Sequence, residues 1–282
     1  MSKTGINILY FFALILFMVY FLIWPTENDI LKGTLIPGAI MAIIGILSSG
    51  LTSILENIKR LRLYIPSKLW YRNKDIRVSI SYLYRIKVRN KYLLVHNSRD
   101  KHLQPVGGVY KSLPDSKKVF ESLGVKVDNL FETEDGVAKS DLRLYVKGKK
   151  LMDFLDWFDC QTDRELSPWR EFYEELIASG VLNRDNFTYV NYNYKGRVCT
   201  PIFLLQVGKL GFFQYDVFDL IPTDSQQKEL DALFEKGNGA LYKWVTEDQI
   251  QTLGYADKTC AGTVDLINPH TKWAHNLKYS TH

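Results

Sequence analysis

Two long apolar runs at the start of the chain set it apart from a polar remainder. Ile6 to Trp24 carries no charged residue over 19 positions, and Thr34 to Leu55 carries none over 22 positions. At about 1.5 Å per residue, each run is long enough as a helix to cross the hydrocarbon of a bilayer. A secretory signal fits poorly, because the first run is too long and a second follows it. The pattern predicts a two-helix transmembrane hairpin over residues 1–62, with helices at about 6–24 and 34–55.

The basic residues around these runs predict the orientation of the hairpin. Lys3 precedes the first run, Lys59, Arg60 and Arg62 follow the second, and the short turn between the runs holds only Lys32. Lysine and arginine are enriched on the cytoplasmic side of membrane helices. We therefore expect a multi-pass protein whose two termini and soluble domain are cytoplasmic.

Small residues recur along the second apolar run. Gly38, Ala42, Gly45 and Ser49 lie at helical spacing and share one face. Small side chains let helix backbones approach closely inside a bilayer. This face packs either against the first helix of the same chain or against another chain, and the sequence leaves both alternatives open.

The remainder alternates between strand and helix patterns, which predicts an α+β domain over residues 63–282. The predicted strands are Val78–Lys87, Tyr92–His96, Leu142–Val146, Phe187–Tyr194, Ile202–Val207, Gly211–Phe218 and Tyr242–Val245. The predicted helices are Ser116–Leu123, a segment from Ser167 to Gly180, Gln226–Glu235 and Thr246–Leu253, and Lys147–Lys150 reads as a basic turn. Ser167 and Thr246 are expected as N-caps.

Composition narrows the chemistry. The net charge of +5 is a mild excess that fits an anionic ligand or leaflet, and we expect no DNA partner. The three cysteines, Cys160, Cys199 and Cys260, are too far apart for a metal site and odd in number, so free thiols are expected.

Two motifs carry candidate chemistry. Gly107-Gly108 follows a predicted strand pair and suits close approach of the backbone to a ligand. Glu171, Glu174 and Glu175 are spaced to share one helix face, where they repel one another unless a cation or an arginine compensates. A solvated acidic face is the simpler alternative.

Together these segments resemble a Nudix domain over about residues 76–256. The run Arg170–Leu176 resembles the core of a Nudix box, Gly107-Gly108 resembles its opening, and Lys243–Thr246 resembles the end of the fold. The resemblance implies an α/β/α sandwich with an insertion at about 109–162. It also implies a Mg²⁺ site at Glu174 and Glu175, with Glu171 beside them.

The box departs from the usual pattern. About sixty residues separate Gly108 from Arg170, the expected first glutamate falls on Thr162, and the leading glycine falls on Asp156. We therefore expect binding rather than hydrolysis, with no cofactor required and Mg²⁺ needed only by a hydrolase.

A membrane hairpin joined to a divergent Nudix domain is similar to the SMODS-associated Nudix (S-Nudix) transmembrane effectors of bacterial CBASS anti-phage defence. That resemblance implies a protein of the bacterial inner membrane that senses a cyclic oligonucleotide, self-associates and disrupts the lipid bilayer.

Candidate ligand residues follow from side-chain chemistry. Positive side chains suit phosphates, aromatic rings suit bases, and the glycine pair with its neighbouring amide suits close contact. They are Arg99, Gln104, Gly107, Gly108, Tyr110, Lys111, Arg143 and Tyr145. Two alternatives stand beside this hypothesis. One is a membrane-anchored Nudix hydrolase acting on nucleoside diphosphate derivatives, and the other is a membrane scaffold without a ligand.

Overall fold

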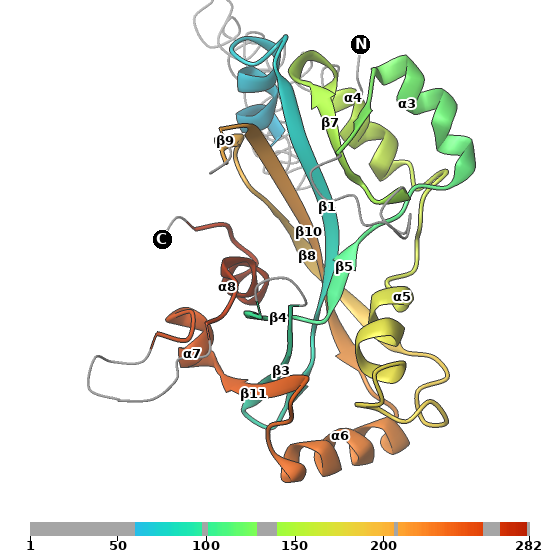
Figure 1. Cartoon of the computed structure of the whole chain (residues 1–282), viewed down its shortest axis with the longest axis vertical. Helices are drawn as coiled ribbons and strands as arrows, with labels where there is room; N and C mark the ends of the chain where they lie inside the picture. The colour runs from blue at the N-terminus through green and yellow to red at the C-terminus, as the bar shows by residue number, and fades with distance from the viewer. Residues whose placement is uncertain (1–59, 98–100, 129–139, 206–207, 256–265, 281–282) are drawn as a thin grey trace, which may run out of the picture. The chain divides into compact units, whose positions relative to one another are not determined.

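The computed structural model describes residues 60–97, 101–128, 140–205, 208–255 and 266–280 (Figure 1). They fall into two compact units. The small unit combines residues 60–75 with Val146–Cys160, and the large unit holds the described residues of Ile76–Tyr145 and Gln161–His282. Because the chain leaves the large unit after Tyr145 and returns at Gln161, the small unit is built from two separate stretches.

Strands dominate the large unit. They are β1 (Asp75–Arg85), β2 (Lys87–Val88), β3 (Lys91–His96), β4 (Leu103–Gln104), β5 (Gly107–Val109), β6 (Lys126–Val127), β7 (Arg143–Lys147), β8 (Asn191–Cys199), β9 (Phe203–Leu204), β10 (Leu210–Ile221) and β11 (Tyr242–Thr246). The helices are η2 (Pro114–Ser116), α3 (Lys117–Leu123), α4 (Gly148–Asp159), α5 (Trp169–Phe172), the π-helical η5 (Tyr173–Ile177), α6 (Asp224–Lys236), α7 (Glu247–Gln251) and α8 (Pro269–Asn276).

The central sheet is mixed. Its strand order is β6-β7-β1-β10-β8, with β5 also paired to β1 and β9 also paired to β10. The long strands β1 and β10 run parallel in register from Ile76 opposite Leu210 to Arg85 opposite Asp219. By contrast, β8 is antiparallel to β10 and β5 is antiparallel to β1. A second sheet has the order β11-β3-β2, with β4 also paired to β3.

Helices cover both faces of the central sheet. Successive side chains of a strand point to opposite faces, so Leu83 and Tyr84 of β1 face different layers. The Tyr84 ring packs on Phe172 of α5, with ring centroids 5.4 Å apart. Leu83 belongs to a buried cluster that includes Trp273 of α8. The predicted α+β fold with a sheet between helical layers is therefore confirmed for the large unit.

The predicted insertion contributes to this sheet. Residues 109–162 contain α3, β6, β7 and α4 (Figure 1). Within it, β7 lies beside β1 and β6 pairs with β7, so the insertion extends the sheet at one edge. Its last helix, α4, belongs to the small unit.

Most predicted elements are confirmed within a few residues. Two of the predicted elements are wrong. The basic turn at Lys147–Lys150 is instead the end of β7 and the start of α4, and the strand expected from Phe187 begins only at Asn191. Helix α8 was not predicted, since the pattern of the chain's tail did not separate helix from loop.

The small unit joins the first described helix, residues 60–68, to α4. The Arg60 guanidinium donates to Asp156 at 2.8 Å and also pairs with Asp159. The backbone N–H of Gly148 donates to the carbonyl of Lys74 at 3.0 Å. Side chains and backbone therefore hold the start of the described chain against α4.

Among the described residues, no helix is both long and apolar enough to cross a membrane. The predicted hairpin, with its small-residue face of Gly38, Ala42, Gly45 and Ser49, lies outside the described residues.

Candidate functional site

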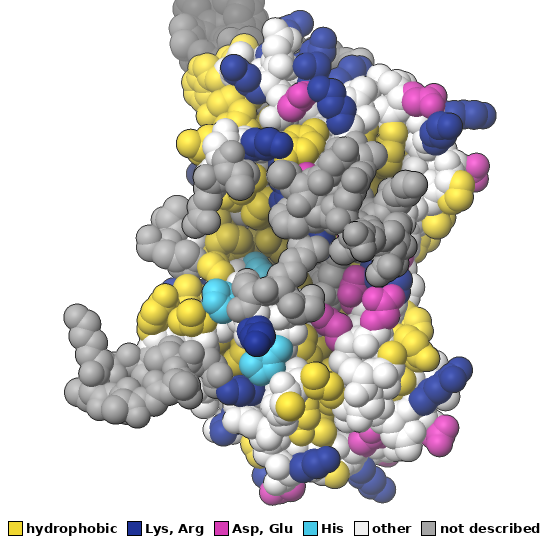
Figure 2. Space-filling model, viewed as in Figure 1, with side chains coloured by type: hydrophobic (Ala, Val, Ile, Leu, Met, Phe, Trp, Pro, Cys, Tyr) yellow, Lys and Arg dark blue, Asp and Glu magenta, His cyan; other side chains and the backbone are white. Residues whose placement is uncertain are grey.

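An acidic helix lies against one face of the central sheet. Phe172 of α5 and Leu176 of η5 are fully buried, and this apolar stripe fixes which side of the helix turns outward. The carboxylates occupy the other sides. Figure 2 shows acidic side chains gathered over α5.

The helix widens just where the acids cluster. The Ala178 N–H donates to the Tyr173 carbonyl at 2.8 Å, which is the i to i+5 bond of a π-helix. Such segments occur frequently at functional sites. Glu174 is 54 % exposed at its side chain, whereas Glu175 lies within hydrogen-bond reach of β5. Glu171 and Glu174 both contact Arg170, whereas Glu175 turns toward β5, so the three glutamates do not all lie on one face as predicted.

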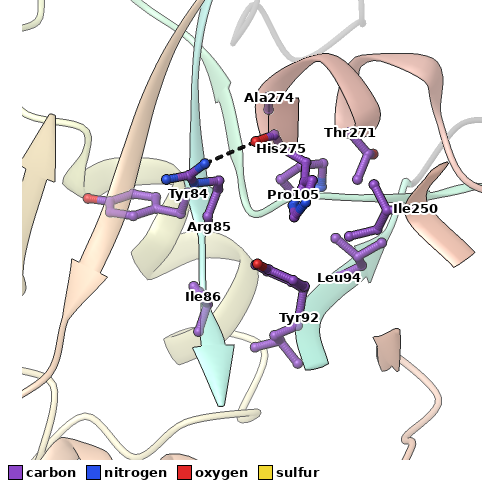
Figure 3. A pocket seen from close by; sticks show the side chains of 11 residues that line it. Tyr84, Arg85, Ile86, Tyr92, Leu94, Pro105, Ile250, Thr271, Ala274 and His275 are labelled. Atoms are coloured by element: carbon purple, nitrogen blue, oxygen red, sulfur yellow. Dashed lines mark hydrogen bonds between the residues drawn. The ribbon is translucent and has the colours of Figure 1, made fainter. Parts of the chain in front are cut away.

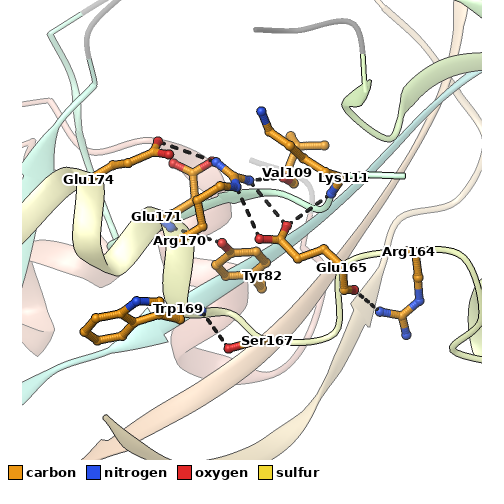
Figure 4. A network of polar contacts seen from close by, with 10 residues as sticks. All are labelled: Tyr82, Val109, Lys111, Arg164, Glu165, Ser167, Trp169, Arg170, Glu171 and Glu174. Atoms are coloured by element: carbon orange, nitrogen blue, oxygen red, sulfur yellow. Dashed lines mark hydrogen bonds and ion pairs between the residues drawn. The ribbon is translucent and has the colours of Figure 1, made fainter. Parts of the chain in front are cut away.

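Arg170 is the centre of the cluster (Figure 4). One guanidinium nitrogen donates to Glu171 at 2.6 Å and lies 3.5 Å from Glu174. The other two nitrogens donate to the carboxylate of Glu165 at 3.2 Å and to the Val109 carbonyl at 2.8 Å. The compensating arginine that the sequence required is thus present, and it ties the helix to β5.

Glu165 is the site residue that the sequence analysis missed. Its carboxylate accepts from Arg170 and from the backbone N–H of Lys111 at 3.1 Å. It lies three positions after Thr162, where the usual box would have its first glutamate, and Thr162 is exposed. A carboxylate five residues before the arginine was the one signal that could have identified it.

Both glycines of the pair lie in close contact with other groups, and at Gly107 the contact is with the backbone. A Cβ on Gly107 would lie 2.1 Å from the Tyr82 carbonyl oxygen, and its φ of +147° is one that L side chains rarely adopt. A Cβ on Gly108 would lie 2.2 Å from Oε1 of Glu171. The groups that approach the two glycines here belong to the protein itself, and the predicted approach of a ligand stays a prediction.

Glu175 is buried beneath this turn. Its Oε2 accepts from the Gly107 N–H at 2.9 Å, and Gln104 also hydrogen-bonds to its carboxyl group. Burial raises the pKa of Glu175 to about 8, against the lowering effect of these hydrogen bonds. Near neutral pH a large share of Glu175 is therefore uncharged.

The pKa of Glu171 is also subject to two opposing effects. Burial raises the pKa of its carboxyl group, while the ion pair with Arg170 lowers it. Its backbone N–H donates to the hydroxyl of Tyr82 at 3.2 Å. Glu171 is therefore held both at its main chain and, through Arg170, at its carboxylate.

Tyr110 is part of the core and does not fit the predicted stacking role. It is only 2 % exposed, and its hydroxyl donates to Asp216 at 3.2 Å. The Tyr82 ring packs against one edge, and the Arg164 guanidinium lies 5.1 Å from its ring centroid. No base could stack on this ring without displacing those neighbours.

Of the other predicted ligand residues, Lys111 contacts the acid cluster through its backbone N–H. Arg143 and Tyr145 are both partly exposed on β7, where Arg143 pairs with Asp141 at 3.8 Å and the Lys209 ammonium lies 4.9 Å from the Tyr145 ring centroid. The Lys111 side chain extends away from Glu165 (Figure 4). Arg99 lies outside the described residues.

The carboxylates do not fit the Mg²⁺ that a Nudix box implies. Mg²⁺ requires several oxygens at about 2.1 Å in octahedral geometry. Here Arg170 engages Glu165, Glu171 and Glu174, while Glu175 accepts from the glycine turn. Within the part of the chain that the structure describes, no three acidic, histidine or cysteine residues are arranged to hold a metal. The cation at the centre of this cluster is the guanidinium.

A small pocket lies elsewhere in the large unit, between β1, β3, α7 and α8 (Figure 3). Tyr92, Ile250 and Ala274 give it a mainly apolar lining. Two buried polar atoms of lining residues, Oγ1 of Thr271 and Nδ1 of His275, have no hydrogen-bond partner among the described residues. None of the predicted site residues lines this pocket.

Comparison with known proteins gives one match, to a protein family. Residues 75–275 match the SMODS-associated NUDIX domain, a span of more than half the chain that contains the glycine turn and the acidic helix. No curated protein and no solved structure matches the chain. The chain belongs to the family of the SMODS-associated NUDIX domain.

Proposed function

We propose that this protein is a membrane effector of CBASS anti-phage defence whose large unit is the receptor for a cyclic oligonucleotide. The predicted hairpin of residues 1–62 is its output: binding drives self-association, and the associated hairpins disrupt the bacterial inner membrane. Family membership supports the defence context.

One observation favours a receptor over a hydrolase. Arg170 and the Gly107 N–H together engage all four carboxylates of the cluster, so the acids serve to hold β5 and the helix together. In this arrangement the part of the domain that resembles a catalytic box acts as a structural element.

Electrostatics separates the ligand phosphates from the acid cluster. Three carboxyl groups contact the single guanidinium of Arg170 there, so even with Glu175 uncharged the cluster repels a phosphate. Arg143 and Tyr145 lie on β7, with the Lys209 ammonium beside the tyrosine ring. We assign the phosphate and base contacts to this strand, with Lys111 and Arg99 as further contacts.

Thermal unfolding of the chain in detergent, with and without cyclic di- and trinucleotides, tests the receptor. A ligand at about 100 times its Kd stabilises by about 2.7 kcal/mol, which for a domain of this size shifts Tm by about 5 to 10 °C. Arg143→Gln should abolish the shift, and Arg184→Gln, an exposed arginine outside β7, should retain it. A panel that leaves Tm unchanged contradicts the proposal.

Self-association of the hairpins has its own test. One hairpin has too few helices to enclose a pore, so disruption of the bilayer requires several chains. Gly45→Leu should retain ligand binding and abolish toxicity in cells that make the ligand. Ala39→Leu, a similar change off the small-residue face, should leave toxicity unchanged. Equal toxicity of the Gly45 variant contradicts packing between chains.

The alternative is a membrane-anchored hydrolase of nucleoside diphosphate derivatives, favoured by the half-exposed carboxylate of Glu174. Turnover of such substrates by the purified chain with Mg²⁺, and its loss in Glu174→Gln, would support it. Absence of turnover together with a Tm shift by a cyclic oligonucleotide separates the receptor from the hydrolase.

A further inference from the structure

Large apolar side chains are exposed where the described chain begins. Leu69 is 68 % exposed and Trp70 is 71 % exposed, and Ile65 one helical turn earlier is exposed as well. Ile65 and Leu69 are four residues apart, which places them on one side of the first described helix and the turn that follows. Side chains of this size are usually covered in a folded protein.

The turn that carries them is held firmly. The Leu69 N–H donates to the Ile65 carbonyl at 3.0 Å, and the Trp70 N–H donates to the Pro66 carbonyl at 3.1 Å. Beyond the turn, the Lys149 N–H of α4 donates to the Arg72 carbonyl at 2.9 Å. The backbone geometry therefore presents Leu69 and Trp70 as a fixed feature of the small unit.

This stretch is also basic. Residues 60–75 hold five lysines and arginines against one acidic residue, Asp75. Arg60 pairs with Asp156 and Asp159, whereas Arg62 and Arg72 are exposed and lie within a few residues of the apolar side chains in the sequence. Apolar and aromatic side chains interleaved with basic ones match the boundary between acyl chains and anionic headgroups.

We propose that residues 60–72 form a docking site for an anionic lipid surface, with Ile65, Leu69 and Trp70 at the acyl boundary and Arg62 and Arg72 at the headgroups. This inference rests on the predicted hairpin, whose second apolar run ends at Leu55, five residues before Arg60. The first described helix lies along the membrane surface and not perpendicular to it.

Chain length makes the two orientations distinguishable. Fourteen residues separate Leu55 from Leu69, and a straight perpendicular helix would raise Leu69 about 21 Å above the hydrocarbon edge. A helix lying along the surface keeps Leu69 at that edge. The depth of this one side chain therefore decides the proposal.

Spin labels in nanodiscs measure that depth. The full chain, with Cys160, Cys199 and Cys260 replaced by serine, carries a nitroxide at Leu69→Cys or at the control Leu166→Cys, an exposed leucine of the large unit. In nanodiscs of phosphatidylglycerol and phosphatidylethanolamine, the label at 69 should be accessible to oxygen and protected from a water-soluble nickel complex. A label at 69 as accessible to nickel as the label at 166 would overturn the proposal.

Two further measurements test separately whether anionic lipid and the hairpin set the depth of the label at position 69. Arg62→Glu with Arg72→Glu should raise the label out of anionic nanodiscs and leave it unmoved in phosphatidylcholine, and an unchanged depth in both removes the anionic lipid from the proposal. Carbonate extraction reports on the hairpin separately. A chain that stays in the membrane with a water-exposed label overturns only the docking, whereas a chain that is extracted overturns the hairpin and the docking together.

Discussion

Two polar networks in the large unit contain the same kinds of group and differ in their charge balance. Around Tyr110, the buried Asp216 accepts from Arg197 at 2.7 Å and from the tyrosine hydroxyl. Around Arg170, one guanidinium serves Glu165, Glu171 and Glu174. The first network pairs its single carboxylate fully. The second carries more acid than its arginine can neutralise.

The Asp216 network is therefore a balanced structural element, whereas the Arg170 cluster has an excess of negative charge. A fully paired buried network specifies a core and has nothing left for a ligand. An overloaded cluster changes its charge state with pH and with any added cation, so its stability depends on conditions. The following predictions test that contrast, from the largest expected effect to the smallest.

Removing the ion pair of the Asp216 network should lower the stability of the fold the most. Arg197→Met leaves the buried carboxylate of Asp216 without its ion-pair partner, which should lower the free energy of unfolding by about 3 to 5 kcal/mol. The control is Arg89→Met, since the ion pair of Arg89 with Glu235 is exposed and should be worth less than about 1 kcal/mol. Urea unfolding of the chain in detergent measures both, and equal losses would contradict the contrast.

Arg170→Met should cost less, and its cost should depend on pH. At pH 7.5 the variant leaves Glu165 and Glu171 facing each other without a cation, a loss of about 2 to 4 kcal/mol. Because burial raises the pKa of Glu171, its carboxyl group is protonated more readily at pH 5, and the loss should shrink there. Adding Glu165→Gln to the variant should recover part of it. A loss that is the same at both pH values rules out the electrostatic account.

Glu175→Gln tests the buried carboxyl group. Because its folded pKa of about 8 lies above the ordinary value of 4.5, protonated Glu175 supports the fold at low pH, and this support is lost as pH rises toward 8. Glutamine does not titrate. From pH 5 to pH 8, the free energy of unfolding of the variant should therefore rise relative to that of the wild type by on the order of 1 to 3 kcal/mol. Urea midpoints at the two pH values give the result, and a constant difference would count against it.

Gly108→Ala should have the smallest effect. The new methyl group displaces the flexible end of Glu171 from Arg170, at a cost of about 1 to 2 kcal/mol. In a Glu171→Ala background the same substitution meets no carboxylate. In a double-mutant cycle, the coupling energy between positions 108 and 171 should therefore account for most of the stability lost in Gly108→Ala. Additive losses would show that the glycine is needed for another reason.

Local signals account for what the sequence predicted well. Thr223 and Thr246 both form capping boxes with glutamines three residues on, and Thr246 had been predicted as an N-cap. The glycine pair lies where protein groups approach the backbone closely, while the predicted approach of a ligand stays a prediction. Each of these depends on residues within a few positions of one another.

Tertiary contacts account for what the sequence missed. Glu165 acquires its role from Lys111 and Arg170, and only Lys111 is distant from it in the sequence. Tyr110 was placed in the ligand site, because no local pattern shows that Asp216 lies beneath it. From the sequence alone, polar residues that bind one another in the folded protein cannot be told apart from polar residues that bind a ligand.

The π-helical turn at Tyr173–Ile177 has a consequence for the rotational phase of the helix. An α-helix advances by about 100° per residue, so one extra residue in a turn offsets everything after it by about that angle. Deleting Tyr173, which precedes Glu175, is expected to rotate Glu175 away from Gly107 while leaving Arg170 in place. A one-residue change in length, with no change in composition, is thus enough to redistribute the carboxylates between the interior and the solvent.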